Sequence, residues 1–522
     1  MSEQQESTTT KSPEEVAEER RRRIRYGLVL GGIALLIFIL WVRYAATQRL
    51  IRDLDSPNIE RRASAASKLL DRGVLEDSLP AQPVNRRAKT AAALARVATK
   101  KALEQMVVLI KDPEDKPQQA ASKAFGTLGA KAMPSLIEVF KSPDLRAKKA
   151  AVKSCGMIGG EAIAALSKAL AVSEAREFSA IALGEVRLKA LEKAKRAEGE
   201  ERDELLRVAE DATQPLLKAA QAKDKDLRRI AITVLGEVKE KRGVPYALKD
   251  LKVAGNTRAA IIALGLIADS RATEAVIPFL DEDKYKIEAA TALGKIGDAR
   301  AAPPLLEKLK DPETQFAGRA VWALRRIGKG AVPYLAPALK SANLPQRRAA
   351  AEAFYGIHDP GSVAPLVGAL SDPDEAVRVA AARALGWKGN AGAMNALLAV
   401  LAGASWRVSD AAIESLAEIG EPAVRPLIEK LKAGDAAVAY AASAALARMA
   451  QIGQASPTQA LLAALSGPDA SARKWAAVTL GDIGDRQTTG ALEAYLKSAS
   501  SKEEKWVASE ALRKLGVSTA SM

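Results

Sequence analysis

Apolar and polar residues alternate with the period of an α-helix along most of the chain. In residues 374–386, DEAVRVAAARALG, the valine, alanine and leucine positions recur three and four residues apart, as on one face of a helix. Residues 422–432, PAVRPLIEKLK, carry leucine and isoleucine at the same spacing. The pattern predicts pairs of amphipathic helices, one rich in alanine and the other in leucine.

A short phrase of the form A-L-G-x-I-G ends the alanine-rich segment and recurs along the chain. Clear copies are ALGKIG at 292–297 and TLGDIG at 479–484. The third positions of the copies are 126, 156, 184, 236, 265, 294, 325, 355, 386, 417, 447, 481 and 513, and fainter copies lie near 67 and 95. The chain therefore contains about fifteen units. No such unit can bury its apolar face alone, so we expect neighbouring units to stack.

A proline follows Asp or Ser shortly before several alanine-rich segments. Asp and Ser are favourable helix N-caps, and proline suits the first helical position, so we expect each pair to begin a helix. The pairs are Asp112-Pro113, Ser142-Pro143, Asp311-Pro312 and Asp372-Pro373.

One step between units, from 184 to 236, is longer than the others. It contains residues 187–211, RLKALEKAKRAEGEERDELLRVAED, which are dense in charge and helix-prone, with Gly199 near the middle. We expect a charged helical insertion of two extended helices that project beyond their neighbours. They form either a solvated, salt-bridged pair or a dedicated docking element.

The thirty-residue period, the D-P-x-x-V-R-x-x-A-x-x-A-L-G-x-I-G-D pattern and the p-x-L-x-x-x-L stretch after it resemble HEAT repeats. More narrowly, they resemble the short HEAT-like repeats first associated with phycobilin lyases. The resemblance covers roughly residues 50–517. It implies an all-α fold, a right-handed α-solenoid of about fifteen HEAT-like helical hairpins. It implies little about function, because this repeat serves many unrelated roles.

An uncharged apolar segment at residues 26–42, YGLVLGGIALLIFILWV, precedes the repeats. Its composition favours a transmembrane helix, which we extend to residues 26–46 because the Arg43 side chain can reach the membrane interface. The lipid bilayer is then one partner of the chain. A cleaved signal peptide is the alternative, but Arg43 and Tyr44 crowd the only candidate cleavage site.

Arginines flank this segment, five at positions 20–25 and three at positions 43, 49 and 52. The denser cluster predicts a cytoplasmic N-terminus and an extracytoplasmic solenoid at a bacterial inner membrane, with the opposite orientation as the alternative. Gly27 and Gly31 have the GxxxG spacing through which two anchors could form a homodimer. We expect residues 1–25 to be a disordered tail and residues 518–522 a short C-terminal tail.

Residues suited to catalysis or metal binding are scarce. The chain has one histidine, His358, and one cysteine, Cys155, which lies in a helical segment and is expected to be buried. No G-x-S-x-G, P-loop or Cys-x-x-Cys motif occurs. We expect a protein without catalytic, cofactor-binding or metal-binding residues. A lyase or lyase-chaperone subunit acting on a protein is the alternative that the family resemblance keeps open.

The net charge of +15 lies on the repeats, because the first 25 residues are neutral in sum. A basic residue recurs eight positions before the aligned point of the repeat, as at Arg228, Arg347, Arg378 and Arg473. The family resemblance implies an internal Asp–Arg ladder at this position. A basic track for an acidic protein partner is the alternative. We expect no nucleic-acid partner, because the basic residues are spread over many repeats.

Every tryptophan outside the apolar segment lies in the C-terminal part of the chain. Tryptophan is enriched where proteins bind one another, so the alanine-rich helices of residues 320–510 are the preferred contact region. The candidate partner-binding residues are Arg228, Arg347, Arg378, Trp387, Trp406, Arg473 and Trp475. The sequence thus favours a membrane-anchored scaffold that binds a protein along its solenoid.

Overall fold

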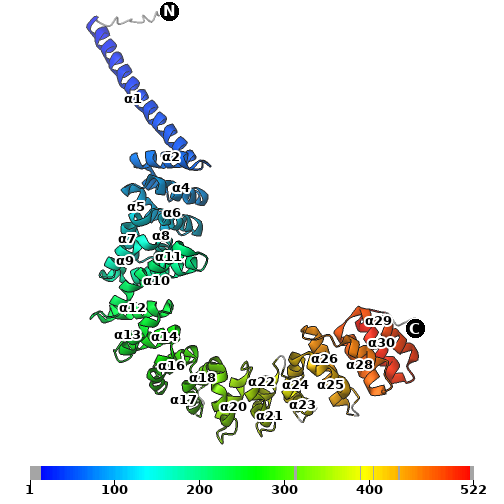
Figure 1. Ribbon diagram of the computed structural model, residues 1–522. Helices are drawn as coiled ribbons and strands as arrows, with labels where there is room; N and C mark the ends of the chain where they lie inside the picture. Colours follow the sequence, from blue (N-terminus) through cyan, green and yellow to red (C-terminus); the bar gives the residue numbers. More distant parts are fainter. Residues whose placement is uncertain are drawn as a thin grey trace, which may run out of the picture. The chain divides into compact units, whose positions relative to one another are not determined.

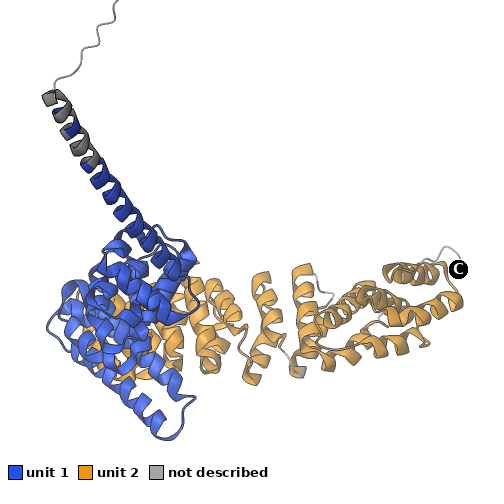
Figure 2. Ribbon diagram, turned by 90° about the horizontal axis from the view of Figure 1, so that it is seen from above, with its two compact units in different colours: residues 1–234 blue, residues 235–522 orange. Residues whose placement is uncertain are grey.

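The computed structural model describes residues 13–310, 314–387, 390–401, 403, 405–432 and 435–517. The expected tails at residues 1–12 and 518–522 lie outside this part of the chain, as does Asp311-Pro312. Every regular element in the described residues is a helix. The chain divides into two compact units, residues 1–234 and residues 235–522 (Figure 2).

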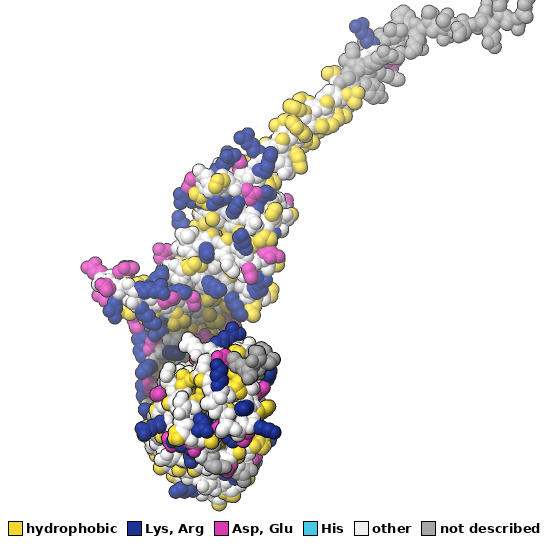
Figure 3. All heavy atoms as spheres, turned by 90° about the vertical axis from the view of Figure 1, so that its right-hand side faces the viewer, with side chains coloured by type: hydrophobic (Ala, Val, Ile, Leu, Met, Phe, Trp, Pro, Cys, Tyr) yellow, Lys and Arg dark blue, Asp and Glu magenta, His cyan; other side chains and the backbone are white. Residues whose placement is uncertain are grey.

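Helix α1 (Pro13–Asp53) leads into the first repeats (Figure 1). Its residues 30–45 are exposed, whereas Ile51 near its end is buried, and among the described residues only this helix is long and apolar enough to cross a membrane. Apolar side chains cover the visible face of the helix beside the repeats (Figure 3). A signal sequence would have the same length and composition.

Residues 13–25 belong to helix α1, although we expected them to be disordered. Glutamate and arginine dominate this stretch, and both have high helix propensity. Pro13 stands at the first helical position, where its missing N–H costs nothing. The polarity of the segment suggested disorder, but its high helix propensity favours the helix.

Unit 1 continues with helices of 5 to 22 residues. They are α2 (Ile59–Asp71), α3 (Val74–Ser78), α4 (Val84–Val97), α5 (Lys100–Ile110), α6 (Asp115–Gly126), α7 (Met133–Lys141), α8 (Leu145–Ile158), α9 (Ile163–Ala169), α10 (Ser173–Ala194) and α11 (Gly199–Ala219). Helix α12 (Lys225–Glu237) begins in unit 1 and ends in unit 2.

Unit 2 repeats the same arrangement. Its helices are α13 (Val244–Asp250), α14 (Thr257–Ile267), α15 (Thr273–Val276), α16 (Lys286–Ile296), α17 (Ala302–Lys308), α18 (Thr314–Ile327), α19 (Val332–Ala338), α20 (Leu344–Phe354), α21 (Val363–Ala369), α22 (Glu375–Leu385), α23 (Met394–Ala399), α24 (Trp406–Ile419), α25 (Glu421–Lys430), α26 (Ala436–Gln451), α27 (Thr458–Leu465), α28 (Ala470–Ile483), α29 (Thr489–Ser498) and α30 (Lys502–Lys514). A 3-10 turn precedes many of the odd-numbered helices, as at Ala299–Ala301.

Two layers of helices make up each unit. The even-numbered helices from α2 to α10 in unit 1, and from α14 to α30 in unit 2, each pack against the next even-numbered helix, and most also pack against a neighbouring odd-numbered helix. Fourteen of the fifteen even-numbered helices in the described residues end at or next to one copy of the A-L-G-x-I-G phrase, and α10 runs seven residues past its copy at 182–187. The predicted α-solenoid of about fifteen hairpins is therefore confirmed.

The glycine of the phrase sets how closely even-numbered helices approach one another. A Cβ atom added at Gly265 would lie 2.6 Å from the Cα atom of Ala292, and one added at Gly294 would lie 2.7 Å from the Cα atom of Ala323. Real Cβ atoms do not approach other atoms this closely. The repeated glycine, with alanine opposite it, thus allows tight backbone packing between successive repeats.

The Asp-Pro and Ser-Pro pairs do not begin the helices as predicted. The N-cap of α8 is Asp144, two residues after Ser142, and the N-cap of α22 is Asp374, two residues after Asp372. Each of these N-cap carboxylates accepts the backbone N–H of the third helical residue. Asp372 instead accepts the N–H of Asp374 and pairs with an arginine of the preceding repeat, which leaves the N-cap to Asp374.

Residues 187–211, the proposed helical insertion, fall in two long helices of unit 1. Helix α10 has 22 residues and α11 has 21, and the two pack against each other. Lys189 and Arg196 pair with Glu192 on the outer part of α10. Such pairs between exposed side chains contribute little free energy, so the packing of the buried faces of α10 and α11 on each other contributes most to their stability.

Candidate partner-binding surface

At the recurrent basic position, three arginines pair with an aspartate of the following repeat, and we call these pairs the Asp–Arg ladder: Arg87–Asp112, Arg176–Asp224 and Arg347–Asp372. Arg347 on α20 lies with its Nε atom 2.9 Å from Oδ2 of Asp372, and Arg87 on α4 lies with its Nε atom 2.6 Å from Oδ2 of Asp112. Both carboxylates are buried, and both lie 25 residues after their arginine. The hydrogen bond from Arg87 to Asp112, more than the electrostatic attraction, raises the pKa of the Arg87 guanidinium.

The other candidate arginines also bind within the chain. Arg228, Arg378 and Arg473 each donate Nη1 hydrogen bonds to two backbone carbonyls that lie five and six residues earlier. Arg473 additionally donates to Glu504 at 3.0 Å. Among the two alternatives for this position, the geometry supports the ladder. These four arginines do not support the basic track that suggested an acidic partner.

Trp387 packs against His358. The two rings stack with centroids 5.7 Å apart and an interplanar angle of 14°. Trp387 is half-buried, and its indole nitrogen has no hydrogen-bond partner among the described residues. His358 lies in the loop after α20 rather than at a helix end. The stacked rings of Trp387 and His358 thus connect the loop after α22 to the loop after α20.

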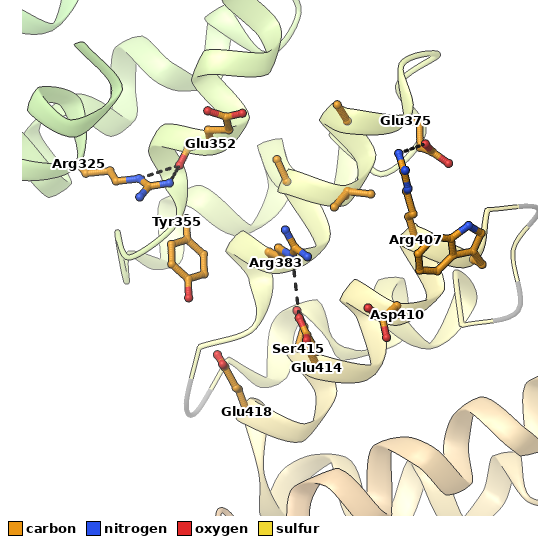
Figure 4. Close-up of a pocket in the computed structure, with 14 residues that line it drawn as sticks. Arg325, Glu352, Tyr355, Glu375, Arg383, Arg407, Asp410, Glu414, Ser415 and Glu418 are labelled. Carbon is orange, nitrogen blue, oxygen red and sulfur yellow. Dashed lines mark hydrogen bonds and ion pairs between the residues drawn. The ribbon is translucent and has the colours of Figure 1, made fainter. Parts of the chain in front are cut away.

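Trp406 contributes to a groove between helices α20, α22 and α24 (Figure 4), which we call the acidic groove. Its volume is about 740 Å³. Ala376, Val379 and Ala380 of α22 provide an apolar floor. The Trp406 side chain is 73 % exposed at the start of α24, and Tyr355, just after α20, is 49 % exposed. The groove combines two exposed aromatic rings, each with an arginine guanidinium close to its face, with an apolar base.

Carboxylates outnumber guanidinium groups in the acidic groove. Five carboxylates and three arginines line it. Arg407 pairs with Glu375 at 3.5 Å, and Arg383 approaches Glu414 at 3.9 Å. Arg325 donates to the backbone carbonyl of Glu352 and lies 5.3 Å from the centre of the Tyr355 ring.

Three carboxylates of the groove, those of Glu352, Asp410 and Glu418, form no ion pair within the described residues. Partial burial, reinforced by the negative charge of Glu414, raises the pKa of Glu418. Asp410, Glu414 and Glu418 follow Trp406 at intervals of four residues, so the four side chains share one face of α24. Like charges one turn apart destabilise a helix slightly, so the three carboxylates destabilise α24 on the side that faces the groove.

Trp475 lies in a second groove, between α26, α28 and α30, which we call the aromatic groove. Its volume is about 540 Å³, and Tyr440, Trp475 and Trp506 line it. The rings of Tyr440 and Trp475 meet edge to face at 6.1 Å. Tyr440 is 62 % exposed and Trp506 is 68 % exposed. Around these rings, Lys474 pairs with Glu503 at 3.0 Å.

Both grooves lie on the alanine-rich helices of residues 320–510, the contact region expected from the tryptophans. The carboxylates of α24 were not among the expected site residues. The signal was present, because W-x-x-x-D-x-x-x-E-x-x-x-E places one aromatic and three acidic residues on a single helix face. In the described residues, no group of three or more His, Cys, Asp or Glu side chains is placed to hold a metal ion.

Among solved structures, the chain is similar to importin beta, with 17% identity over 90% of this chain and 72% of that one, and a TM-score of 0.38. Yeast importin-beta (Kap95p) gives 15% identity, 91% and 72% coverage, and a TM-score of 0.36. The complex of CpcE and CpcF of phycocyanin lyase from Nostoc sp. PCC7120 gives 25% identity, 41% and 91% coverage, and a TM-score of 0.23. We draw no functional conclusion from structures at these scores.

No curated protein matches the sequence. The family model described as HEAT repeats matches residues 105–184, 254–325, 273–356, 302–372, 363–431 and 424–513, which together span more than half of the chain. The matches coincide with the helical hairpins described above. The chain belongs to the HEAT-repeat family.

Proposed function

We propose that this chain is a membrane-anchored, non-catalytic scaffold that binds a partner protein on the even-numbered helices of its C-terminal repeats. The observation that carries the proposal is the gathering of exposed aromatic side chains in the acidic and aromatic grooves. Tyr355, Trp406, Tyr440 and Trp506 are all at least 49 % exposed there. Large exposed aromatic residues at a concave site are typical anchors of protein–protein interfaces.

The regular recurrence of packing residues from repeat to repeat supports a binding role over a catalytic one. The ladder arginines and the phrase glycines serve packing between repeats, and what varies from repeat to repeat is the side chains on the outward face of the even-numbered helices. A solenoid with a constant interior and a variable face can bind an extended partner across several repeats.

The anchor is the transmembrane helix within residues 26–46. Its support is the unburied apolar stretch of α1 and the arginines on either side of it. The proposed orientation places the N-terminus in the cytoplasm and the solenoid outside it, at a bacterial inner membrane. Gly27 and Gly31 are the proposed contact of two anchors in a homodimer.

Site-specific crosslinking tests the binding role. A photo-crosslinking amino acid is placed in the full chain at Trp406 or Trp506, and in control chains at Glu307 or Glu429, which are exposed on α17 and α25. In the cells that make the protein, we expect the same partner protein to be crosslinked from the two groove positions and not from the controls. Equal labelling from all four positions, or none, contradicts the proposal.

Protease accessibility tests the anchor. With a tag after residue 522, protease added to intact spheroplasts should remove the tag while the membrane is closed. A tag that stays protected until lysis reverses the orientation. A chain that alkaline carbonate extracts from the membrane fraction contradicts the anchor itself.

A further inference from the structure

The acidic groove differs in charge from the rest of the molecule. The chain as a whole has a net charge of +15, yet the side chains that line this groove sum to −2, from five carboxylates and three guanidinium groups. The carboxylates of Glu352, Asp410 and Glu418 lack an ion-pair partner in the described residues of the chain. A groove with this balance attracts cations and repels phosphate or acidic peptide.

The apolar and aromatic residues of the groove indicate which kind of cation it suits best. Ala376, Val379 and Ala380 offer an apolar floor, and Trp406 is 73 % exposed above the acidic face of α24. A lysine or arginine side chain needs both features, because its aliphatic stem packs on apolar surface while its charged end meets a carboxylate or an aromatic ring. An inorganic cation would use neither the floor nor the rings.

The dimensions of the groove fit a peptide segment. Its volume of about 740 Å³ is in the range of sites that bury several side chains. Trp406, Asp410, Glu414 and Glu418 follow one another along α24 at one-turn spacing, so successive acidic contacts lie roughly 6 Å apart along the helix. Every second residue of an extended peptide faces the same side at a similar interval.

We propose that the acidic groove binds an extended basic segment of the partner protein, with lysine or arginine side chains inserted at alternate positions. Asp410 and Glu418 receive the cationic ends, and Trp406 and Tyr355 receive one cationic or apolar side chain at each end of the groove. This inference rests on the proposed scaffold function and gives its partner a chemical class. It replaces the acidic partner that the ladder arginines had suggested.

Peptide binding to the full chain in a non-ionic detergent tests the inference. The probes are fluorescein-labelled nonapeptides of alternating lysine and glycine, of alternating arginine and glycine, and of alternating glutamate and glycine. We expect fluorescence anisotropy to report binding of the two basic peptides, weakened by salt, and no binding of the acidic one. Binding of the glutamate peptide in preference to the basic ones overturns the proposal.

Charge-matched variants separate the groove from general electrostatics. The double substitution Asp410→Asn with Glu418→Gln removes two groove carboxylates, and Glu307→Gln with Glu429→Gln removes two exposed carboxylates from α17 and α25. The groove pair should weaken basic-peptide binding about tenfold and the control pair less than about twofold. Equal losses in the two pairs overturn the proposal.

Trp406→Ala adds a test that leaves the charge unchanged. The side chain is largely exposed, so the fold is expected to survive, and circular dichroism checks this for every variant. Binding of the arginine peptide should fall about fivefold, as expected for loss of a cation–π contact. Unchanged binding removes the aromatic part of the proposal. If the crosslinked partner is still captured by the Asp410→Asn, Glu418→Gln chain, the scaffold function stands and this inference fails.

Discussion

The guanidinium of Arg347 holds the carboxylate of Asp372 at 2.9 Å, across the boundary between two repeats. Both side chains are largely buried, with exposures of 15 % and 8 %. Arg347 also donates to the carbonyl of Ser341, and Asp372 accepts the N–H of Asp374 at the start of α22. The pair and its hydrogen bonds thus tie helix α20 to the loop before it and to the loop that leads into α22.

Arg347→Ala should destabilise this region by about 3 kcal/mol, because it leaves the carboxylate of Asp372 buried without its counter-ion. The adjacent Arg348 provides the control. It pairs with Asp374 at 2.6 Å but is 48 % exposed, so Arg348→Ala should cost less than about 1 kcal/mol. Hydrogen exchange of helices α20 and α22 measures both effects. Similar exchange in the two variants would mean that the buried pair contributes no more than an exposed one.

The close approach of Gly265 to helix α16 yields a second prediction. In Gly265→Ala the new Cβ would lie 2.6 Å from the Cα of Ala292, so the two helices must separate, at a cost of about 1–3 kcal/mol. Gly368 is the matched control, because it lies in helix α21 with no atom within 4 Å of an added Cβ. Gly368→Ala should stabilise the chain by about 0.5–1 kcal/mol. Thermal unfolding of the two variants should shift in opposite directions.

Glu504 makes the C-terminal repeats sensitive to acid. The hydrogen bond from Arg473, helped by the backbone N–H groups of Ser500 and Ser501, lowers the pKa of Glu504 to about 2 from an ordinary 4.5. A carboxyl group with a depressed pKa stabilises the fold above its unfolded pKa, and this contribution is lost as the pH falls from about 4.5 towards 2. At neutral pH the contribution is up to roughly 3 kcal/mol.

Glu504→Gln should therefore destabilise helices α28 and α30 at pH 7 and flatten their loss of stability between pH 5 and pH 2, roughly the interval over which the carboxyl titrates. Glu503→Gln is the control, because Glu503 is 68 % exposed in its pair with Lys474. Hydrogen exchange of α28 and α30 across this pH interval reports the difference. A steeper acid loss in Glu504→Gln than in the parent chain would contradict the assigned sign.

The fold was predictable because the repeat phrase encodes a backbone contact. A glycine opposite an alanine, as at Gly294 and Ala323, lets two helix backbones come into contact, so its recurrence marks several of the helix pairs. It was harder to predict whether the recurrent arginines form an internal ladder or face a partner. The position of Arg378 in the repeat is fixed by the sequence, but whether its side chain turns inward depends on the carbonyls of Asp372 and Pro373, which only folding brings within reach.

The tryptophans marked the region in which the two grooves lie, but the sequence did not indicate the charge of the grooves. Tryptophans mark the C-terminal repeats, yet only the structure separates Trp387, stacked on His358, from the open Trp406. The net charge of +15 suggested an acidic partner. Because arginines of the ladder are satisfied internally, the sign of the exposed grooves is set by residues such as Asp410 that the overall balance conceals.

Cys155 should be unreactive in the folded chain. It is fully buried on α8, and burial raises the pKa of its thiol to about 12. Since the thiolate is the reactive species, a thiol reagent at pH 8 meets a group that is both inaccessible and protonated. Labelling by an aromatic disulfide should therefore proceed only as fast as unit 1 opens around α8. Glu429→Cys supplies an exposed thiol in the same chain and should react at once. Immediate labelling of two thiols in that variant would show that helix α8 opens freely, against the close packing of α6, α8 and α10.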